Sequence, residues 1–235
     1  MWERESAPRL ISPLGLGRGY SFQGICMRVE PQVKRAIAFV DGQNLYFAAK
    51  EAFGYSFPNY DVPQLCRVVC GQRGWTLVRT QFYTGVPQVS DDEKWHKFWT
   101  AKLAVMGTRG VRVYSRSLRY RNQTLRLPDG RTYTMLIGQE KGIDIRIALD
   151  IVHAANHNEC DVALVFSQDQ DLTEVAQEVR EIAAGQGRWF KMASAFPISP
   201  TSHNARGIDK TDWIRIDRAT YDQCLDPTDY RQKPE

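Results

Sequence analysis

The chain has 235 residues, of which 43% are hydrophobic and 25% are charged, and its formal net charge at pH 7 is +4. Length and composition predict one globular α/β domain with flanking tails. The mildly basic charge is compatible with a polyanionic partner. The cysteines form no C-x-x-C pair, which argues against a disulfide framework or zinc ribbon and predicts reduced thiols in the cytoplasm. No apolar run approaches the roughly 18 residues of a membrane span, so we expect none.

The two ends of the chain are predicted to lie outside the domain. Residues 1–32 are rich in Gly, Pro, Ser and Arg and have no apolar block, which is typical of a flexible tail and not of a secretory signal. Met27, just before the first predicted strand, is a candidate start residue. We expect residues 33–217 to form the domain and residues 218–235 to form a C-terminal tail.

Apolar runs alternate with helical periodicity, which predicts a parallel sheet covered by helices on both faces. The turn signal Pro128-Asp129-Gly130 predicts a hairpin that continues from the third strand. In chain order, the predicted elements are a strand over 35–40, helices over 45–53 and 62–72, a strand over 75–83, a helix over 91–106, a strand over 111–120 running into a hairpin that returns over 133–137, a helix over 143–155, a strand over 162–166, a helix over 172–184, and strands over 189–193 and 213–216.

Carboxylates follow two of the apolar strands. Residues 36–40 run into Asp41-Gly42-Gln43-Asn44, and residues 162–166 run into Ser167-Gln168-Asp169-Gln170-Asp171. Ligands of open α/β sheets bind outside the carboxyl ends of the strands, so these side chains are expected to meet. Clustered carboxylates repel one another unless a cation neutralises them. The pattern therefore predicts a site for a hard divalent metal.

A third acidic segment, Glu140-Lys141-Gly142-Ile143-Asp144, opens a predicted helix. The helix dipole favours an ionised carboxylate at the position of Asp144. Asp150, six residues further on, faces another direction and ranks lower as a ligand. A lone Asp at a strand end is more often a helix cap or turn residue. Its recurrence after two strands, with a third acid opening a helix, favours the metal site instead.

The chemistry that needs such a cluster is metal-assisted phosphoryl transfer. Magnesium prefers oxygen ligands, and one or two ions can activate water and stabilise an in-line displacement. No phosphate-binding G-x-x-x-x-G-K-[ST] loop competes with this interpretation. A phosphatase of the haloacid dehalogenase type needs a second Asp two residues after its nucleophile, where this chain has Gln43, and it ranks low.

These three motifs resemble the NYN domain family, a branch of the PIN-like ribonucleases that includes the LabA-like proteins. The resemblance covers residues 34–216, and Gln168 stands where the family usually has glycine. It implies a three-layer α/β/α fold with a central, mostly parallel sheet, and an endoribonuclease that depends on Mg²⁺ or Mn²⁺. Carried over by motif, the catalytic and metal-binding acids would be Asp41, Asp144, Asp169 and Asp171, with Asn44 as their polar companion. A non-catalytic RNA-binding or scaffold module of the same fold is the alternative.

Basic residues near these motifs are candidate substrate contacts. Residues 109–131 contain seven arginines and one acid, with tyrosines interleaved, which suits phosphate contact and base stacking. A solvated hairpin with ordinary surface arginines is the other interpretation. The candidate substrate-binding residues are Lys141, Ser167, Arg116, Arg119, Arg121 and Arg206. RNA is the expected partner, although the acids do not distinguish it from DNA, and the sequence leaves a homo-oligomer open. His153 and His157 have metal-binding spacing without a third ligand, so we interpret them as a surface pair.

Overall fold

The computed structural model of the protein describes residues 28–231. Cys26, Met27 and most of the predicted N-terminal tail lie outside the described residues. The elements are β1 (Lys34–Asp41), α1 (Gly42–Phe53), α2 (Val62–Gln72), β2 (Trp75–Val86), α3 (Glu93–Thr108), β3 (Arg112–Ser117), β4 (Arg119–Arg126), β5 (Thr132–Gln139), α4 (Ile143–Asn156), β6 (Val162–Phe166), the 3₁₀ helix η1 (Gln170–Leu172), α5 (Thr173–Gly185), β7 (Lys191–Pro197), β8 (Asp212–Ile216) and α6 (Arg218–Asp222). Within this described range, no helix has the length and apolarity needed to cross a membrane.

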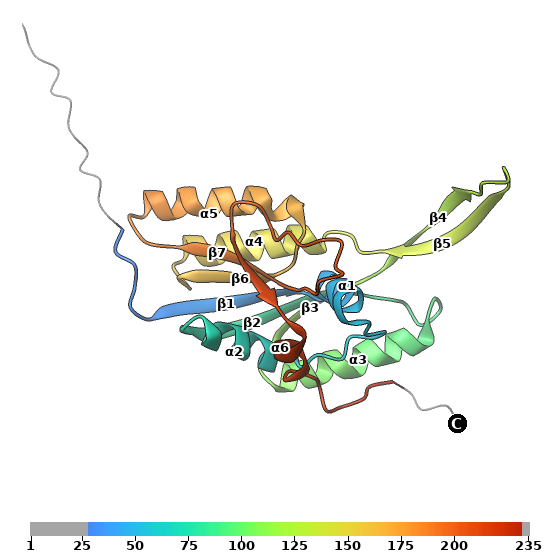
Figure 1. Ribbon diagram of the computed structural model, residues 1–235, viewed down its shortest axis with the longest axis horizontal. Coiled ribbons are helices and arrows are strands. Elements are labelled where there is room, and N and C mark those ends of the chain that lie inside the picture. Colours follow the sequence, from blue (N-terminus) through green and yellow to red (C-terminus); the bar gives the residue numbers. More distant parts are fainter. Residues whose placement is uncertain (1–27, 232–235) are drawn as a thin grey trace, which may run out of the picture.

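The centre of the molecule is a six-stranded sheet in the order β3-β2-β1-β6-β7-β8 (Figure 1). All five neighbouring pairs are parallel. The first half of the chain builds the sheet outward from β1, and the second half builds it in the opposite direction from β6. The strand order therefore reverses between β1 and β6, and such a switch point is where open α/β sheets bind their ligands.

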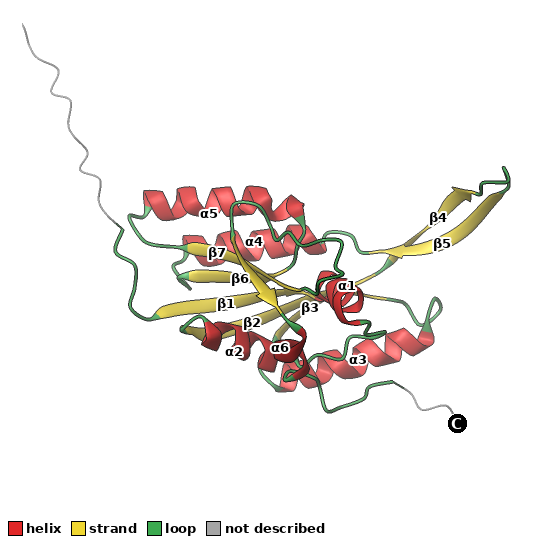
Figure 2. Ribbon diagram, viewed as in Figure 1, coloured by secondary structure: helices red, strands yellow, loops and turns green. Residues whose placement is uncertain are grey.

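Helices cover both faces of this sheet (Figure 2), and the last six residues of β1 are buried. Ile37 and Phe39 of β1 pack with α4 and α5, whereas Ala36, Ala38 and Val40 pack with the cluster that contains side chains of α1, α2, α3 and α6. Successive side chains of a strand point to opposite faces, so a strand covered on both sides is apolar at every position. This explains the continuous apolar run in the sequence and confirms the predicted α/β class.

Aspartates fix where the helices of the first half begin. The side chains of Asp41, Asp61 and Asp92 accept hydrogen bonds from backbone amides in the first turns of α1, α2 and α3, at 2.9–3.0 Å. Each satisfies an amide that has no partner within its own helix. Asp61 and Asp92 act as helix caps, and Asp41 is a helix cap in addition to any further role.

The hairpin of β4 and β5 forms a separate two-stranded sheet that projects from the domain (Figure 1). β3 ends at Ser117 and β4 begins at Arg119, so the single strand predicted over 111–120 is split. Tyr120 pairs with Gly138 across the hairpin. Because side chains alternate along a strand, Arg119 and Arg121 lie on the face opposite Tyr120.

The expectation of a C-terminal tail from residue 218 is wrong for its first part. These residues form α6, and Tyr221 and Cys224 are fully buried against the sheet. Asp226 then makes a 3.0 Å ion pair with Lys102 of α3, whose side chain is only 1% exposed. The segment is short and polar in sequence. It is held in place by the ion pair of Asp226 and by the burial of Tyr221, and local sequence patterns do not reveal these long-range contacts.

Candidate active site

Asp41 stands at the switch point of the sheet. It is the last residue of β1 and is only 4% exposed. Its Oδ1 accepts a hydrogen bond from the backbone amide of Asn44 at 3.0 Å, and its Oδ2 lies 3.5 Å from the hydroxyl oxygen of Ser167. Ser167 directly follows β6, the neighbour of β1. The two predicted motifs after these strands therefore meet through their side chains.

The side-chain orientation of Asn44 is set by the second motif. Its Oδ1 accepts a hydrogen bond from the backbone amide of Gln168 at 3.0 Å. This leaves the amide nitrogen of Asn44 with no hydrogen-bond partner among residues 28–231. The NH₂ group of this partly buried side chain can donate a hydrogen bond to an anionic oxygen.

Asp169 and Asp171 occupy the turn after β6. Asp169 is half-buried, and its Oδ1 accepts the backbone amide of Asp171 at 2.9 Å, which caps η1. Its own amide donates to the hydroxyl oxygen of Ser167 at 3.1 Å. Asp171 is exposed. Ser167 thus holds the turn that presents Asp169, and its predicted contact with substrate stays a prediction.

Asp144 is brought to the same edge by a glycine turn. Gly142 precedes α4 with a φ of 77°, in the left-handed region, and a Cβ there would lie 2.6 Å from Nη1 of Arg116. Burial raises the pKa of Asp144, and the negative charges of Asp169 and Asp171 raise it further. These effects place the three carboxylates in one electrostatic neighbourhood.

Glu140 joins this group, although the sequence analysis did not include it among the site residues. Its carboxylate accepts a hydrogen bond from the backbone amide of Gly85 on β2. A Cβ on Gly85 would lie 2.7 Å from Cγ of Glu140, so the approach requires glycine there. Burial, reinforced by the charge of Asp144, raises the pKa of Glu140 to about 7. Its position at the head of the Glu140–Asp144 motif was the available signal.

We call Asp41, Glu140, Asp144, Asp169 and Asp171 the acidic cluster. Burial raises the pKa of Asp41 to about 7, and the charges of Glu140, Asp144 and Asp169 add to the rise against the opposing hydrogen bond from Asn44. Asp41, Asp144 and Asp169 therefore lie close enough to influence one another at the edge where β1 and β6 end, and their role as metal ligands stays a prediction. Burial is the largest of these effects on Asp41, and the neighbouring carboxylates add to it.

The donor chemistry of the acidic cluster fits a hard divalent ion. In the described part of the chain, no group of three or more His, Cys, Asp or Glu side chains is arranged to hold a metal by itself. Mg²⁺ commonly takes only one or two carboxylates and keeps several waters, so it does not need a closed protein cage. The buried carboxylate of Asp41 is the best placed of these donors to gain from a cation.

The predicted substrate cations divide into two groups. Arg116, Arg119 and Lys141 line a depression of about 530 Å³ beside the start of α4, which we call the basic depression. Arg116 also donates to a backbone carbonyl, that of Lys141, at 3.3 Å. Arg121 lies further along β4, outside this lining, and Arg206 pairs with Asp209 at 2.9 Å.

Gln168 takes a structural role in place of the usual glycine. It has no positive φ, so its position does not demand glycine. Its side-chain amide donates to the backbone carbonyls of Asn204 and Arg206 at 3.2 and 2.7 Å. The substitution ties the polar segment after β7 to the turn that carries Asp169.

The residues ranked low by sequence lie away from the acidic cluster or have other partners. Asp150 accepts a hydrogen bond from the hydroxyl of Tyr83 at 2.8 Å and forms an ion pair with Arg146. The rings of His153 and His157 stack 4.0 Å apart at the C-terminal end of α4, and His153 lies 3.6 Å from Glu159. This arrangement agrees with a surface histidine pair.

Fold and site together define a parallel α/β domain with a carboxylate cluster at its switch point, the class of the PIN-like domains. The family model of the NYN domain matches residues 35–185, and the chain belongs to this family. The predicted family is confirmed, and its LabA-like branch stays a prediction.

Two solved structures are similar to the chain at low identity. A protein of unknown function from Vibrio parahaemolyticus is 17% identical with a TM-score of 0.47, over 81% of this chain and 98% of that chain. Ribokinase from Giardia lamblia is 11% identical with a TM-score of 0.34, over 74% of this chain and 53% of that chain. A comparison with curated proteins gives no match.

Proposed function

We propose that the protein is an endoribonuclease that hydrolyses RNA phosphodiester bonds with the help of Mg²⁺ or Mn²⁺. The observation that supports it most is the convergence of Asp41, Asp144 and Asp169, which come from three segments of an NYN domain. Four free, buried thiols in the described chain fit the reducing cytoplasm as its compartment.

In this proposal, Asp41, Asp144 and Asp169 would hold the metal, and Asp171 would support a second ion or the attacking water. When bound, the metal would supply charge neutralisation at the phosphate and activation of water. The amide nitrogen of Asn44, left free by the Gln168 contact, would donate to a phosphate oxygen. The basic depression would hold the neighbouring phosphates of the strand.

Cleavage of end-labelled RNA tests this proposal. We expect wild-type protein to cut in Mn²⁺ and not in chelator, and Asp41→Asn to lose several orders of magnitude in rate. The matched control is Asp150→Asn, which makes the same chemical change in a carboxylate already paired with Arg146. Full activity of Asp41→Asn would reject the assignment. A labelled DNA of the same sequence, run in parallel, reports the choice of sugar.

A non-catalytic RNA-binding module is the second candidate. It is favoured by the absence, within residues 28–231, of three acids arranged to hold a metal. RNA binding that persists without any cleavage in Mn²⁺ would support this candidate over the enzyme.

A further inference from the structure

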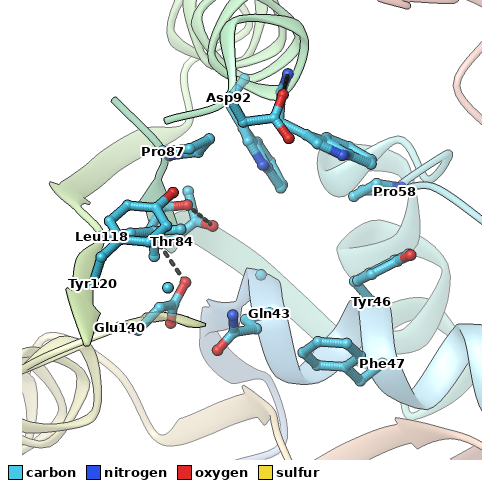
Figure 3. A pocket seen from close by; sticks show the side chains of 15 residues that line it. Gln43, Tyr46, Phe47, Pro58, Thr84, Pro87, Asp92, Leu118, Tyr120 and Glu140 are labelled. Atoms are coloured by element: carbon cyan, nitrogen blue, oxygen red, sulfur yellow. Dashed lines mark hydrogen bonds between the residues drawn. The ribbon is translucent and has the colours of Figure 1, made fainter. Parts of the chain in front are cut away.

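A pocket of about 250 Å³ lies beside the acidic cluster, and five aromatic residues contribute to its wall (Figure 3). We call it the aromatic pocket and define it by Tyr46, Phe47, Trp95, Trp99 and Tyr120. We propose that it binds one unpaired nucleobase of the strand whose phosphate lies at the acidic cluster. The inference rests on the proposed function, because that function makes the ligand a nucleic-acid strand.

Three separate elements supply the rings of the aromatic pocket. Tyr46 and Phe47 come from α1, Trp95 and Trp99 from α3, and Tyr120 from the base of the hairpin. Trp99 is fixed by core contacts, with its ring centroid 6.0 Å from that of Phe82. Fixed aromatic walls suit a base, because every base has a π-face and single-stranded RNA is read by stacking its splayed bases.

The position and size of the pocket match a base adjacent to the scissile phosphate. Glu140 belongs to both the acidic cluster and the pocket lining, and Gly42 of the lining directly follows Asp41. The pocket is smaller than the roughly 300–1,000 Å³ of sites for drug-sized ligands. It therefore suits a single flat ring system better than a whole cofactor.

The pocket also offers a polar edge. Figure 3 shows the side chain of Gln43 between Glu140 and Phe47, at the floor of the pocket. Gln43 lies one helical turn before Phe47 on α1. Its side-chain amide has no hydrogen-bond partner among residues 28–231. A primary amide carries donors and an acceptor, which is the combination that the edge of a base presents. A purely apolar occupant would leave this group unpaired.

The hairpin connects the aromatic pocket to the basic depression. Tyr120 packs so closely on Gly138 that a Cβ there would lie 2.9 Å from the Tyr120 ring. Leu118, just before β4, lines both the pocket and the depression that holds Arg116 and Lys141. If one base of an RNA strand occupies the pocket, the next phosphates of that RNA would lie near the guanidinium groups of the basic depression. This is the charge complementarity expected for nucleic acid.

The test measures binding separately from cleavage. Wild-type protein in chelator is titrated into fluorescein-labelled oligouridylate, and the Kd is read by fluorescence anisotropy. We expect Phe47→Ala and Tyr120→Ala each to raise the Kd by about 5- to 150-fold, as for loss of one stacked base. Phe47 is 53% exposed, so its truncation spares the fold. Tyr133→Ala, an exposed aromatic of the same hairpin outside the pocket, is the matched control and should bind as wild type does.

A second measurement leaves the protein unchanged. In a series of RNAs, one base at a time is replaced by an abasic sugar. At one position this replacement should weaken binding by wild-type protein as much as Phe47→Ala does. The same RNA should cause no further loss of affinity in Phe47→Ala. Equal affinity for intact and abasic RNA, or unaltered binding by both pocket variants, would overturn the inference and leave the nuclease proposal standing. Pocket-dependent binding without cleavage in Mn²⁺ supports the pocket and rejects the nuclease, whereas wild-type protein that binds no RNA overturns both.

Discussion

Replacing Asp41 with Asn should make the metal-free protein more stable, although the residue is buried at the centre of the site. Asn keeps the shape of the side chain, and its oxygen can still cap α1 through the amide of Asn44. What it removes is a negative charge in a position that is 4% exposed and faces other carboxylates. The gain therefore comes from relieving desolvation and repulsion, and not from a new contact.

The magnitude follows from the pKa of Asp41, which rises from an ordinary 3.8 to about 7 in the folded protein. Between these values the native state holds a proton that the unfolded chain releases, so wild-type stability falls as the pH rises through this window. The full loss is about 4 kcal/mol as an upper bound. Asp41→Asn has no carboxylate at this position and does not lose this stability. The free energy of unfolding of the variant should therefore equal that of wild type near pH 4 and exceed it increasingly up to pH 8.

The assay is urea unfolding of both proteins in chelator across this pH range, followed by circular dichroism and analysed by linear extrapolation. Asp150→Asn is the control, because it loses an ion pair with Arg146 and should become less stable, by up to about 1 kcal/mol. Equal stability of wild type and Asp41→Asn at pH 8, or a variant less stable at every pH, would refute the electrostatic reasoning.

Three further outcomes are expected. Glu140→Gln should keep an oxygen for the hydrogen bond from Gly85 but lower RNA cleavage by about 10- to 100-fold, with a melting temperature in chelator at pH 8 that is at least that of wild type, because burial raises the pKa of this carboxyl to about 7; wild-type activity would remove Glu140 from the site. Gln168→Gly should speed hydrogen exchange of the amides in residues 202–209, because two side-chain hydrogen bonds are lost; unaltered exchange would contradict the bracing role. Asp226→Ala should cost about 3–5 kcal/mol in urea unfolding, since it strands the buried ammonium of Lys102; a loss near zero would show that α3 does not need this pair.

Most of the sheet was predictable because its strands are buried on both faces. A strand such as β6, whose five residues are all buried, reads as an unbroken apolar run whatever its surroundings. The acids that follow these runs were also predictable, because the carboxyl ends of parallel strands lie at one edge of the sheet. β7 runs over Lys191–Pro197 instead of the predicted 189–193, because its end is defined by pairing with β8 and not by its own composition.

The features that were missed depend on contacts between distant segments. Glu140 heads one of the predicted motifs, but its place in the acidic cluster is fixed by the amide of Gly85 on β2, a contact that the sequence does not show. The aromatic pocket combines α1, α3 and the hairpin, and the tryptophans of α3 look like ordinary core residues in the sequence. The burial of Tyr221 likewise needs the sheet against which α6 packs.

Binding of Mn²⁺ tests the metal site most directly, because it requires neither substrate nor turnover. The signal of free hydrated Mn²⁺ in electron paramagnetic resonance is followed as protein is added. We expect wild type and Asp150→Asn to deplete this signal saturably, and Asp41→Asn and Asp144→Asn to do so much more weakly. Equal depletion by all four proteins, or no depletion by wild type, would contradict a metal centre at the carboxyl ends of β1 and β6.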